Sequence, residues 1–426
     1  MPLFILTVGL IIILLLGIPA AYSMILSSMV LLGLERGFAN IPHAMIAQRV
    51  FNGMDSFPLL AVPLFILVGQ LMNDAGVTDR IFNFAKVFVG HFRGGLAHVN
   101  IVASLIFAGM SGSAVADAAG LGAIEIKAMT DEGYDLDFSV GVTASSSLIG
   151  PIIPPSIPVV LYAVLAGVSV TRLLIAGFIP GLIMTACLMG YVIYRAHKTE
   201  YPVRPRATMK EFQKAFKEAF FPILTPLILV GGIVSGVFTA TEAAGVAALY
   251  ALILFLFYKK FSLPALLKVF KDTTKTSANV MFILAAAQIY STLVIRSRIP
   301  VTITQAVFTV TSGYWGVLLL VVLVLLVVGC FMSTSVAINI LTPVLVPLVV
   351  AAGVDPLYFG IIMIVVLMIG QLTPPFGMVL FAILGICDIP FNRLVKSVML
   401  FTIPIVISLI LMLIFPRLVT FLPGFY

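Results

Sequence analysis

Long apolar segments alternate with short polar stretches along almost the whole chain, and this pattern predicts membrane-embedded helices. A helix that crosses the hydrocarbon core needs roughly 20 apolar residues, and the runs 315–328 and 401–415 are of this kind. Residues 3–34 are interrupted at Gly17-Ile18-Pro19, so we expect two helices there. The other segments expected to be helical are 56–73, 76–93, 173–195, 220–235, 239–257, 259–275, 277–295, 298–313 and 394–415.

Two apolar segments are broken by glycine and a double proline at corresponding places in the two halves of the chain. Gly-Pro-Ile-Ile-Pro-Pro-Ser at 150–156 recurs as Gly-Gln-Leu-Thr-Pro-Pro-Phe at 370–376, an offset of 220 residues from Gly150 to Gly370. The same offset relates four further pairs: Gly109 and Gly329, Ser113 and Ser333, Gly133 and Gly353, Asp135 and Asp355. A broken helix is tolerated at membrane depth only where it is buried in protein or lines a cavity. Matched breaks therefore indicate a substrate and ion site.

A pair of short apolar arms precedes each break. The arms within 96–129 surround residues 109–113, and a second pair occupies 316–351. Each first-half arm is about 15 residues long, which is too short for a crossing, so we expect re-entrant hairpins followed by broken spans at 138–168 and around 370–375. The predicted fold class is an all-α polytopic membrane protein with two inverted-topology repeats, each holding a re-entrant hairpin and a broken helix.

The basic residues test this inverted arrangement. Each half has five predicted crossings, and an odd number inserts the second half upside down. With the linker 196–219 in the cytoplasm, most of the 24 Lys and Arg lie inside, as the positive-inside rule requires, and both termini lie outside. If 3–34 were a single tilted helix, the repeat would instead be parallel. The only basic residues placed outside are Arg36, Arg49, Arg172, Arg296, Arg298 and Arg417.

The composition agrees with a membrane protein and excludes several other classes. The 426 residues are 61% hydrophobic and 10% charged, with a mean hydropathy of +1.20, which excludes a soluble fold and disorder. The net charge of +7 comes from loops, so it sets orientation and does not imply a nucleic-acid partner. The apolar N-terminus lacks a basic leader and a cleavage motif, so we expect a retained helix. The three cysteines form no CxxC, and no HExxH or P-loop motif is present, so no metal other than sodium and no organic cofactor is expected.

Polar residues enter the apolar core at the hairpin tips and the breaks. Hydroxyls, amide oxygens and the carbonyls of unwound helices are the groups that coordinate sodium in transporters. We therefore predict a pair of sodium sites, one per repeat. Close helix packing is the structural alternative for single serines and glycines. The predicted sodium-binding residues are Ser111, Ser113, Asp117, Ser145, Ser147, Gly150, Ser333, Ser335, Asn339, Gly370 and Thr373.

Two acidic residues need separate interpretations. Asp117 lies in an apolar arm, where an acid is costly and usually functional; it could bind sodium, brace the tip, carry a proton, or only hydrogen-bond a neighbouring serine. Its counterpart in the second half is Ala337, so the two sites are not equivalent. Glu125 is expected near the hairpin base, paired with Lys127. No Lys or Arg is predicted at mid-span, so an anionic substrate would depend on helix N-termini, hydroxyls and bound sodium; a neutral substrate is also compatible.

The motifs at 109–113 with Asp117, 150–156, 236–244 and 370–375 resemble those of the large membrane subunit of tripartite ATP-independent periplasmic (TRAP) transporters, over essentially the whole chain. The resemblance implies a sodium-driven importer of the bacterial inner membrane. A periplasmic solute-binding protein would deliver a small carboxylate, such as a sialic acid or a C4-dicarboxylate. A separate small four-helix membrane subunit and membrane lipids would be the other partners.

The resemblance also implies an elevator mechanism, in which a transport domain slides against a scaffold. The first repeat would be 1–195, with scaffold 1–93 and transport part 94–195. After the cytoplasmic linker 196–219, the second repeat would be 220–426, with scaffold 220–313 and transport part 314–426. The substrate would lie between the tips, near Ser111, Pro154, Ser333, Pro374 and Gly377.

Three alternatives remain at this stage. A sodium–carboxylate symporter with a similar fold would need no binding protein. An intramembrane enzyme would need a base or nucleophile system, but Asp117 has no visible partner acid and no histidine is predicted at mid-span. A channel would need a continuous polar stripe, which the long spans lack.

Overall fold

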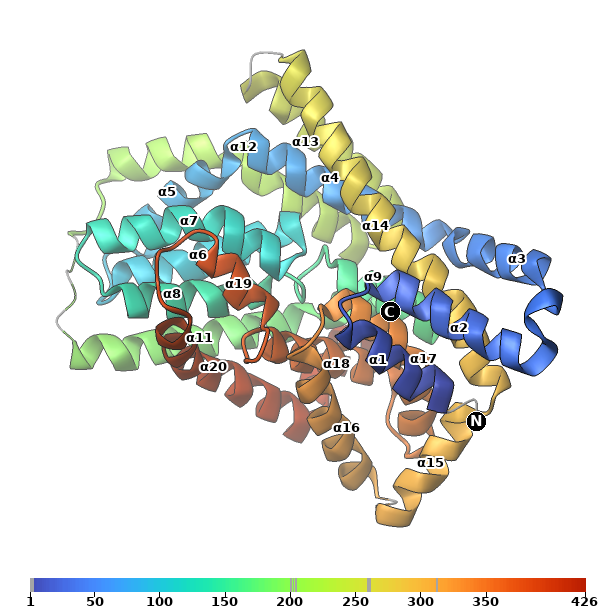
Figure 1. Cartoon of the computed structure of the whole chain (residues 1–426). Coiled ribbons are helices and arrows are strands. Elements are labelled where there is room, and N and C mark those ends of the chain that lie inside the picture. Colours follow the sequence, from blue (N-terminus) through green and yellow to red (C-terminus); the bar gives the residue numbers. More distant parts are fainter. Residues whose placement is uncertain (1–3, 200, 202, 204, 259–261, 312) are drawn as a thin grey trace.

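The computed structural model describes residues 4–199, 201, 203, 205–258, 262–311 and 313–426, and within them every regular element is a helix (Figure 1). Seven helices in this part of the chain are long and apolar enough to cross a membrane, or up to eight if one bent pair is a single span. The chain is therefore an all-helical, multi-pass membrane protein. Arg204, Lys259 and Lys260, which contribute to the predicted orientation, lie outside the described residues.

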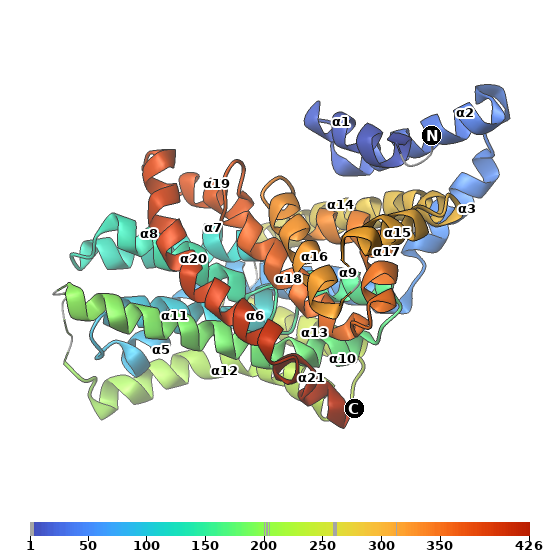
Figure 2. The same ribbon diagram turned by 90° about the horizontal axis from the view of Figure 1, so that it is seen from below.

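The N-terminal segment forms two helices separated at the predicted break. A π-helical turn Phe4–Gly9 leads into α1 (Leu10–Leu15), and α2 (Ala20–Arg36) begins after Gly17 and Pro19. Gly17 has a φ of 84° and Pro19 has no N–H to donate, so the helix cannot continue. Figure 2 shows this pair at one edge of the molecule, joined to the bundle by α3 (His43–Met54).

The rest of the first half builds a hairpin and a broken helix. The turn between α6 and α7 consists of only two residues, Gly112 and Ser113, and Gly112 has a φ of 62° that suits glycine. The two arms have 17 and 18 residues, or about 26 Å, which is less than the hydrocarbon thickness. The helices are α4 (Ala61–Asp74), α5 (Val77–Val89), α6 (Gly95–Ser111), α7 (Ala114–Asp131), α8 (Leu136–Ser146), α9 (Ile157–Ala166), α10 (Val170–Ala176) and α11 (Phe178–Lys198).

The second half contains helices that start and end in the same numerical frame. Both ends of α17 lie 220 residues after those of α7, and α18 begins 220 residues after α8. The two cis peptide bonds, Pro154-Pro155 and Pro374-Pro375, are in this frame too. The helices are α12 (Met209–Val234), α13 (Ala240–Tyr258), α14 (Leu263–Arg296), α15 (Ile299–Val310), α16 (Tyr314–Gly329), α17 (Thr334–Ala351), α18 (Pro356–Gln371), α19 (Met378–Leu384), α20 (Phe391–Ile414) and α21 (Arg417–Thr420).

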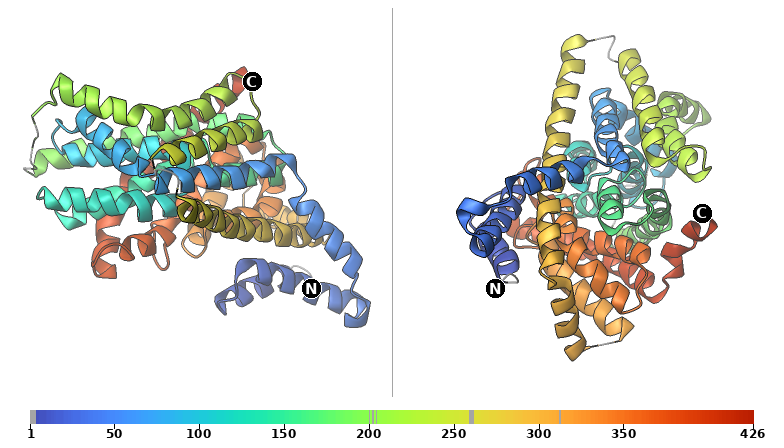
Figure 3. Two further views of the ribbon diagram at one scale, coloured as in Figure 1. Left: turned by 90° about the horizontal axis from the view of Figure 1, so that it is seen from above. Right: turned by 90° about the vertical axis from the view of Figure 1, so that its right-hand side faces the viewer.

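Two helices are longer than the apolar pattern predicts. The segments 259–275 and 277–295 were expected to be separate, but α14 is continuous over 34 residues because no glycine or internal proline interrupts it after Pro264. Figures 1 and 3 show α14 running along much of the molecule. Helix α12 begins inside the predicted linker, where Thr208 and Glu211 form a capping box. The capping interaction predicted for Thr239 and Glu242 is confirmed, with the Thr239 amide donating to Glu242 Oε2 at 2.8 Å.

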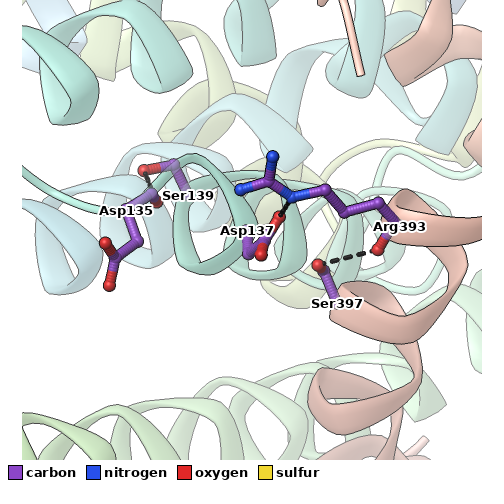
Figure 4. Close-up of polar contacts among 5 residues, drawn as sticks. All are labelled: Asp135, Asp137, Ser139, Arg393 and Ser397. Carbon is purple, nitrogen blue, oxygen red and sulfur yellow. Dashed lines mark hydrogen bonds and ion pairs between the residues drawn. The ribbon is translucent and has the colours of Figure 1, made fainter. Parts of the chain in front are cut away.

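The two broken helices form the centre of the bundle. Every residue from 138 to 163 and from 358 to 372 is buried, whereas many large apolar side chains on the outer helices, such as Leu323 and Phe257, are exposed, as a lipid-facing surface requires. Helices α8 and α20 pack together, and Arg393 Nε donates to Asp137 Oδ1 at 2.7 Å across them (Figure 4). Because both side chains are about half exposed, this ion pair contributes at most about 1 kcal/mol, and apolar packing holds the centre together.

Candidate functional site

A cavity of about 250 Å³ lies where the tips of the two hairpins meet. The first tip contributes residues 111–116 and the second contributes residues 333–335. The breaks contribute Pro151, Ile157, Pro158 and Gln371. Segments separated by more than 200 residues in the sequence therefore share one cavity.

Two helices from outside the hairpins complete the wall of this cavity. Gly69, Gln70 and Asn73 come from α4, and Thr276 and Val280 come from α14. Gly69 brings α4 close to the first tip, because a Cβ at this glycine would lie 3.3 Å from the carbonyl oxygen of Met110. The cavity therefore lies between the hairpins on one side and α4 with α14 on the other.

The cavity is polar, and no charged side chain of the described residues lines it. Its polar groups are the amides of Gln70, Asn73 and Gln371 and the hydroxyls of serines and threonines. Three helices also begin at its wall: α7 after Ser113, α9 at Ile157 and α17 at Thr334. The N-terminus of a helix carries a partial positive charge and free N–H groups, so three of them favour an anion.

Four of the predicted site residues line the cavity, namely Ser111, Ser113, Ser333 and Ser335. Ser113 caps α7, with its Oγ accepting from the Ala116 amide at 3.4 Å. Ser333 precedes α17 without a side-chain capping bond. The hydroxyl of Ser333 is therefore available to a ligand.

The first tip packs tightly against the first break. A Cβ on Gly112 would lie 2.5 Å from the carbonyl oxygen of Pro155, and one on Gly150 would lie 3.8 Å from the backbone of Ser113. Ser147 Oγ donates to the Ala144 carbonyl at 2.9 Å, whereas the fully buried Ser145 Oγ has no hydrogen-bond partner among the described residues. Gly150, Ser145 and Ser147 thus lie behind the tip and not on the cavity wall.

The second tip meets the second break in the same manner. A Cβ on Gly370 would lie 2.5 Å from the backbone of Gly329, and the Gly377 amide donates to the Cys330 carbonyl at 3.2 Å. Gln371 Nε2 donates to Thr334 Oγ1. Asn339 Nδ2 donates to the Ser335 carbonyl at 2.7 Å. Thr373 Oγ1 donates to the Ile369 carbonyl at 2.9 Å.

The remaining predicted residues form a layer behind the cavity. Gly370, Thr373, Asn339, Pro154, Pro374 and Gly377 are not part of its wall. Several buried oxygen atoms in this layer lack a hydrogen-bond partner among the described residues, including Asn339 Oδ1 and Gln371 Oε1. A buried polar atom without a partner is rare, because it loses the hydrogen bonds that it would make in water.

Asp117 is the clearest case of an unpartnered polar group. It is 2% exposed in the first turn of α7, and neither carboxylate oxygen has a hydrogen bond in the described part of the chain. The alternative that it only bonds a neighbouring serine is therefore not what the structure contains. The nearest polar chain runs alongside it between α6 and α8: Ser104 Oγ donates to Ser146 Oγ at 3.1 Å, and Ser146 Oγ donates to Asn100 Oδ1 at 2.7 Å.

Glu125 was misplaced by the sequence analysis. It is 1% exposed, its Oε1 has no hydrogen-bond partner, and no ion pair joins it to Lys127 within the described residues. Glu125 follows Asp117 by eight residues, so both acids lie on the same face of α7. This spacing was visible in the sequence and could have identified Glu125 as a second buried acid.

Sequence reasoning also missed part of the cavity wall. Gln70 and Asn73 lie three residues apart in an otherwise apolar helix, and that spacing on one face was an available signal. Gln371 stands within the second break motif, at the position of Pro151 in the first. Thr276 gave no signal, because nothing in the sequence places α14 beside the hairpins.

An all-helical bundle with an apolar outer surface and a polar cavity between two hairpin tips has the architecture of a membrane transporter. Residues 7–418 match the family described as "Tripartite ATP-independent periplasmic transporter, DctM component". The chain belongs to this family, as its motifs predicted, and is a transporter component, not an enzyme.

The similar proteins cover nearly the whole chain. The chain is 43% identical to the sialic acid TRAP transporter large permease protein SiaM of Vibrio cholerae, covering 96% of each chain. It is 40% identical to the sialic acid TRAP transporter permease protein SiaT of Haemophilus influenzae, covering 97% of this chain and 67% of that protein. Among solved structures, the YdaH transporter of Alcanivorax borkumensis has a similar fold, with a TM-score of 0.63, 13% identity and 91% of each chain covered.

The close contact between Gly370 and Gly329 leads to a testable prediction. Gly370→Ala should separate the second tip from its break, because the atoms that its methyl group would meet are backbone atoms at 2.5 Å. We expect a loss of about 1–3 kcal/mol in stability, measured as a lower unfolding temperature of the purified chain in detergent. Gly245→Ala on α13 is the control, since nothing lies within 4 Å of that position. Equal unfolding temperatures for the two variants would contradict the close packing.

Proposed function

We propose that this chain is the large subunit of a sodium-coupled importer and that a small carboxylate passes through the cavity between the hairpin tips. The observation that carries the proposal is the convergence of three helix N-termini on a cavity lined without charged side chains. Partial positive charges from helix ends attract a carboxylate. They bind it less permanently than a buried Arg or Lys would, which suits a solute that must be released.

The buried oxygen atoms behind the tips support sodium as the coupling ion. Asp117 Oδ1 and Oδ2, Ser145 Oγ and Asn339 Oδ1 are all buried without hydrogen-bond partners in the described residues. A cation bound among hard oxygen ligands would compensate for their lost hydration. We propose one site at the first tip and break, and a second at the other tip and break. The proposed ligands are Ser111, Ser113, Asp117, Ser145, Ser147 and Gly150 for the first site, and Ser333, Ser335, Asn339, Gly370 and Thr373 for the second.

The matched helix frames support two inverted repeats and an elevator mechanism. In this proposal the transport domain comprises 94–195 and 314–426, and the scaffold comprises 1–93 and 220–313. The cavity lies where hairpin residues face α4 and α14 of the scaffold, so sliding of the hairpins would carry the solute across. The linker 196–219 would be cytoplasmic, and both termini would be periplasmic.

The relatives support a sialic acid or a similar carboxylate as the solute. The proteins at 43% and 40% identity are named for sialic acid, whereas the Pseudomonas aeruginosa C4-dicarboxylate TRAP transporter large permease protein DctM is 35% identical over 89% of this chain and 87% of that protein. Amides and hydroxyls on the cavity wall suit a polyhydroxylated acid. The substrate would sit near Ser111, Ser333 and the breaks at Pro154, Pro374 and Gly377. The proposed partners are a separate small membrane subunit and a periplasmic solute-binding protein in a bacterial inner membrane.

Solute uptake into proteoliposomes tests this function. The liposomes would contain the chain and its small subunit, with an inward sodium gradient and sialic acid or a C4-dicarboxylate as the solute. We expect uptake only when both sodium and the cognate binding protein are present. Uptake that needs sodium alone would contradict the proposal and favour a self-sufficient symporter.

A variant of Asp117 tests the first sodium site. Asp117→Ala should lower sodium-dependent uptake by about tenfold or more, because the site loses its only full negative charge among the proposed ligands. The measurement is the initial uptake rate at several sodium concentrations. Asp131→Ala is the matched control, since Asp131 is an exposed acid at the other end of the same helix. Wild-type sodium dependence in Asp117→Ala would exclude a coupling role.

Crosslinking tests the elevator movement. Gln70→Cys on α4 and Ala116→Cys on α7 place two thiols on opposite sides of the cavity, in a chain whose native Cys187, Cys330 and Cys387 have been replaced. We expect the yield of crosslinked chain to change when sodium and solute are added, because the hairpin moves relative to α4. An unchanged yield under all conditions would argue against sliding.

A further inference from the structure

A second cavity, of about 440 Å³, lies between α5 and the start of α12. These helices run side by side (Figures 1 and 2). The ionisable side chains on its wall are Lys86, His91, Arg206, Glu211, Lys214 and Glu218. None of these residues belongs to the transport cavity.

The charges on this wall leave a positive excess. Lys86 Nζ is 3.2 Å from Glu132 Oε1, and Glu211 is occupied at the helix start, where its Oε2 accepts from the Thr208 amide at 2.7 Å. Arg206 and Lys214 have no ion-pair partner among the described residues. Glu218 is the one remaining acid on the wall. The cavity therefore suits an anion of low charge.

The length of α12 places this cavity near the level of lipid phosphate groups. The helix has 26 residues, about six more than the roughly 20 that cross the hydrocarbon core. The three basic residues of α12 all lie in its first nine residues. The polar first turns therefore extend beyond the hydrocarbon, and Lys214 lies at the boundary.

An aromatic cluster on the same two helices faces away from the polar wall. The ring of Phe84 on α5 lies 6.4 Å from that of Phe212 and 6.2 Å from that of Phe216 on α12, and 6.2 Å from that of Phe88. Phe88 is 57% and Phe216 is 43% exposed. The helix pair thus offers cationic groups and an adjoining apolar surface, which matches a molecule with an anionic head and an apolar tail.

We propose that this cavity binds the phosphate of an anionic phospholipid, with Arg206 and Lys214 contacting the headgroup and the aromatic cluster contacting an acyl chain. Basic residues at the cytoplasmic membrane surface attract anionic lipids, and Arg can bind phosphate through two parallel hydrogen bonds. A zwitterionic lipid would not compensate the excess charge. A soluble phosphate ion would make no use of the aromatic cluster. Because α5 joins α4 to the hairpin helix α6, the bound lipid would contact the segment that connects the two.

Native mass spectrometry of the purified full chain tests the site. Dioleoylphosphatidylglycerol and dioleoylphosphatidylcholine would be titrated separately. The cavity variant is Arg206→Gln/Lys214→Gln, and the matched control is Lys210→Gln/Lys217→Gln, which removes the same charge from exposed residues outside the cavity wall. We expect the cavity variant to bind phosphatidylglycerol on the order of tenfold more weakly, with little change in the control.

Two further measurements distinguish a lipid site from a site for free phosphate and from general attraction to basic residues. Excess inorganic phosphate should leave phosphatidylglycerol binding unchanged; displacement would show that the cavity binds the free anion and would overturn the lipid proposal. Phe88→Ala should weaken phosphatidylglycerol binding while leaving the thermal unfolding temperature in phosphatidylcholine near that of the wild type. Equal binding of the two lipids, or equal losses in the cavity variant and the control, would also overturn it.

Discussion

The need to satisfy backbone polar groups in a medium without water governs this structure. The breaks around residues 150–156 and 370–377 free N–H and C=O groups at membrane depth, and hydrocarbon offers them no partner. The fold solves this by placing a hairpin tip against each break, and glycine makes the approach close enough: Gly112 against Pro155, and Gly329 against Gly370. The hydrogen bond from the Gly377 amide to the Cys330 carbonyl is one direct result. The tips, the breaks and the burial of α8 and α18 are thus a single solution.

The same constraint explains why the cavity is polar without being charged. Closing each break against a tip brings helix starts to one place, and their free N–H groups provide positive potential without a buried Lys or Arg. An unpaired buried cation would be costly in the empty protein. Helix dipoles, amides and hydroxyls leave the empty cavity tolerable, and they become most effective when an anion enters. A transporter needs both states to be of similar free energy.

The sequence predicted the breaks, the hairpins, the tip residues and the capping box at Thr239 because each depends on a local pattern. Glycine and proline stop helices wherever they occur, and Ser113 caps the helix that follows it. The wall formed by Gln70, Asn73 and Thr276 could not be predicted in the same way. Apolar periodicity indicates that a helix exists and which residues are polar, but it does not say which helix packs beside which. The continuity of α14 was missed for another reason: its charged first half suggested an interfacial segment, yet nothing in its sequence ends a helix.

The two halves are alike in backbone but differ in charge, and this difference has a physical consequence. The face of α7 that carries Asp117 and Glu125 corresponds to Ala337 and Leu345 on α17. The second half instead provides neutral amides, from Asn339 and Gln371, where the first has Ala119 and Pro151. Two buried acids without a basic partner are stable in hydrocarbon only if a cation or protons accompany them. A neutral amide pair carries no such requirement. If sodium binds at both tips, the site near Asp117 must therefore bind it more tightly when the cavity is empty, and the second site must depend more on the negative charge of the solute. Backbone symmetry combined with charge asymmetry in this way would couple the solute to the ion without any charged residue in the cavity itself.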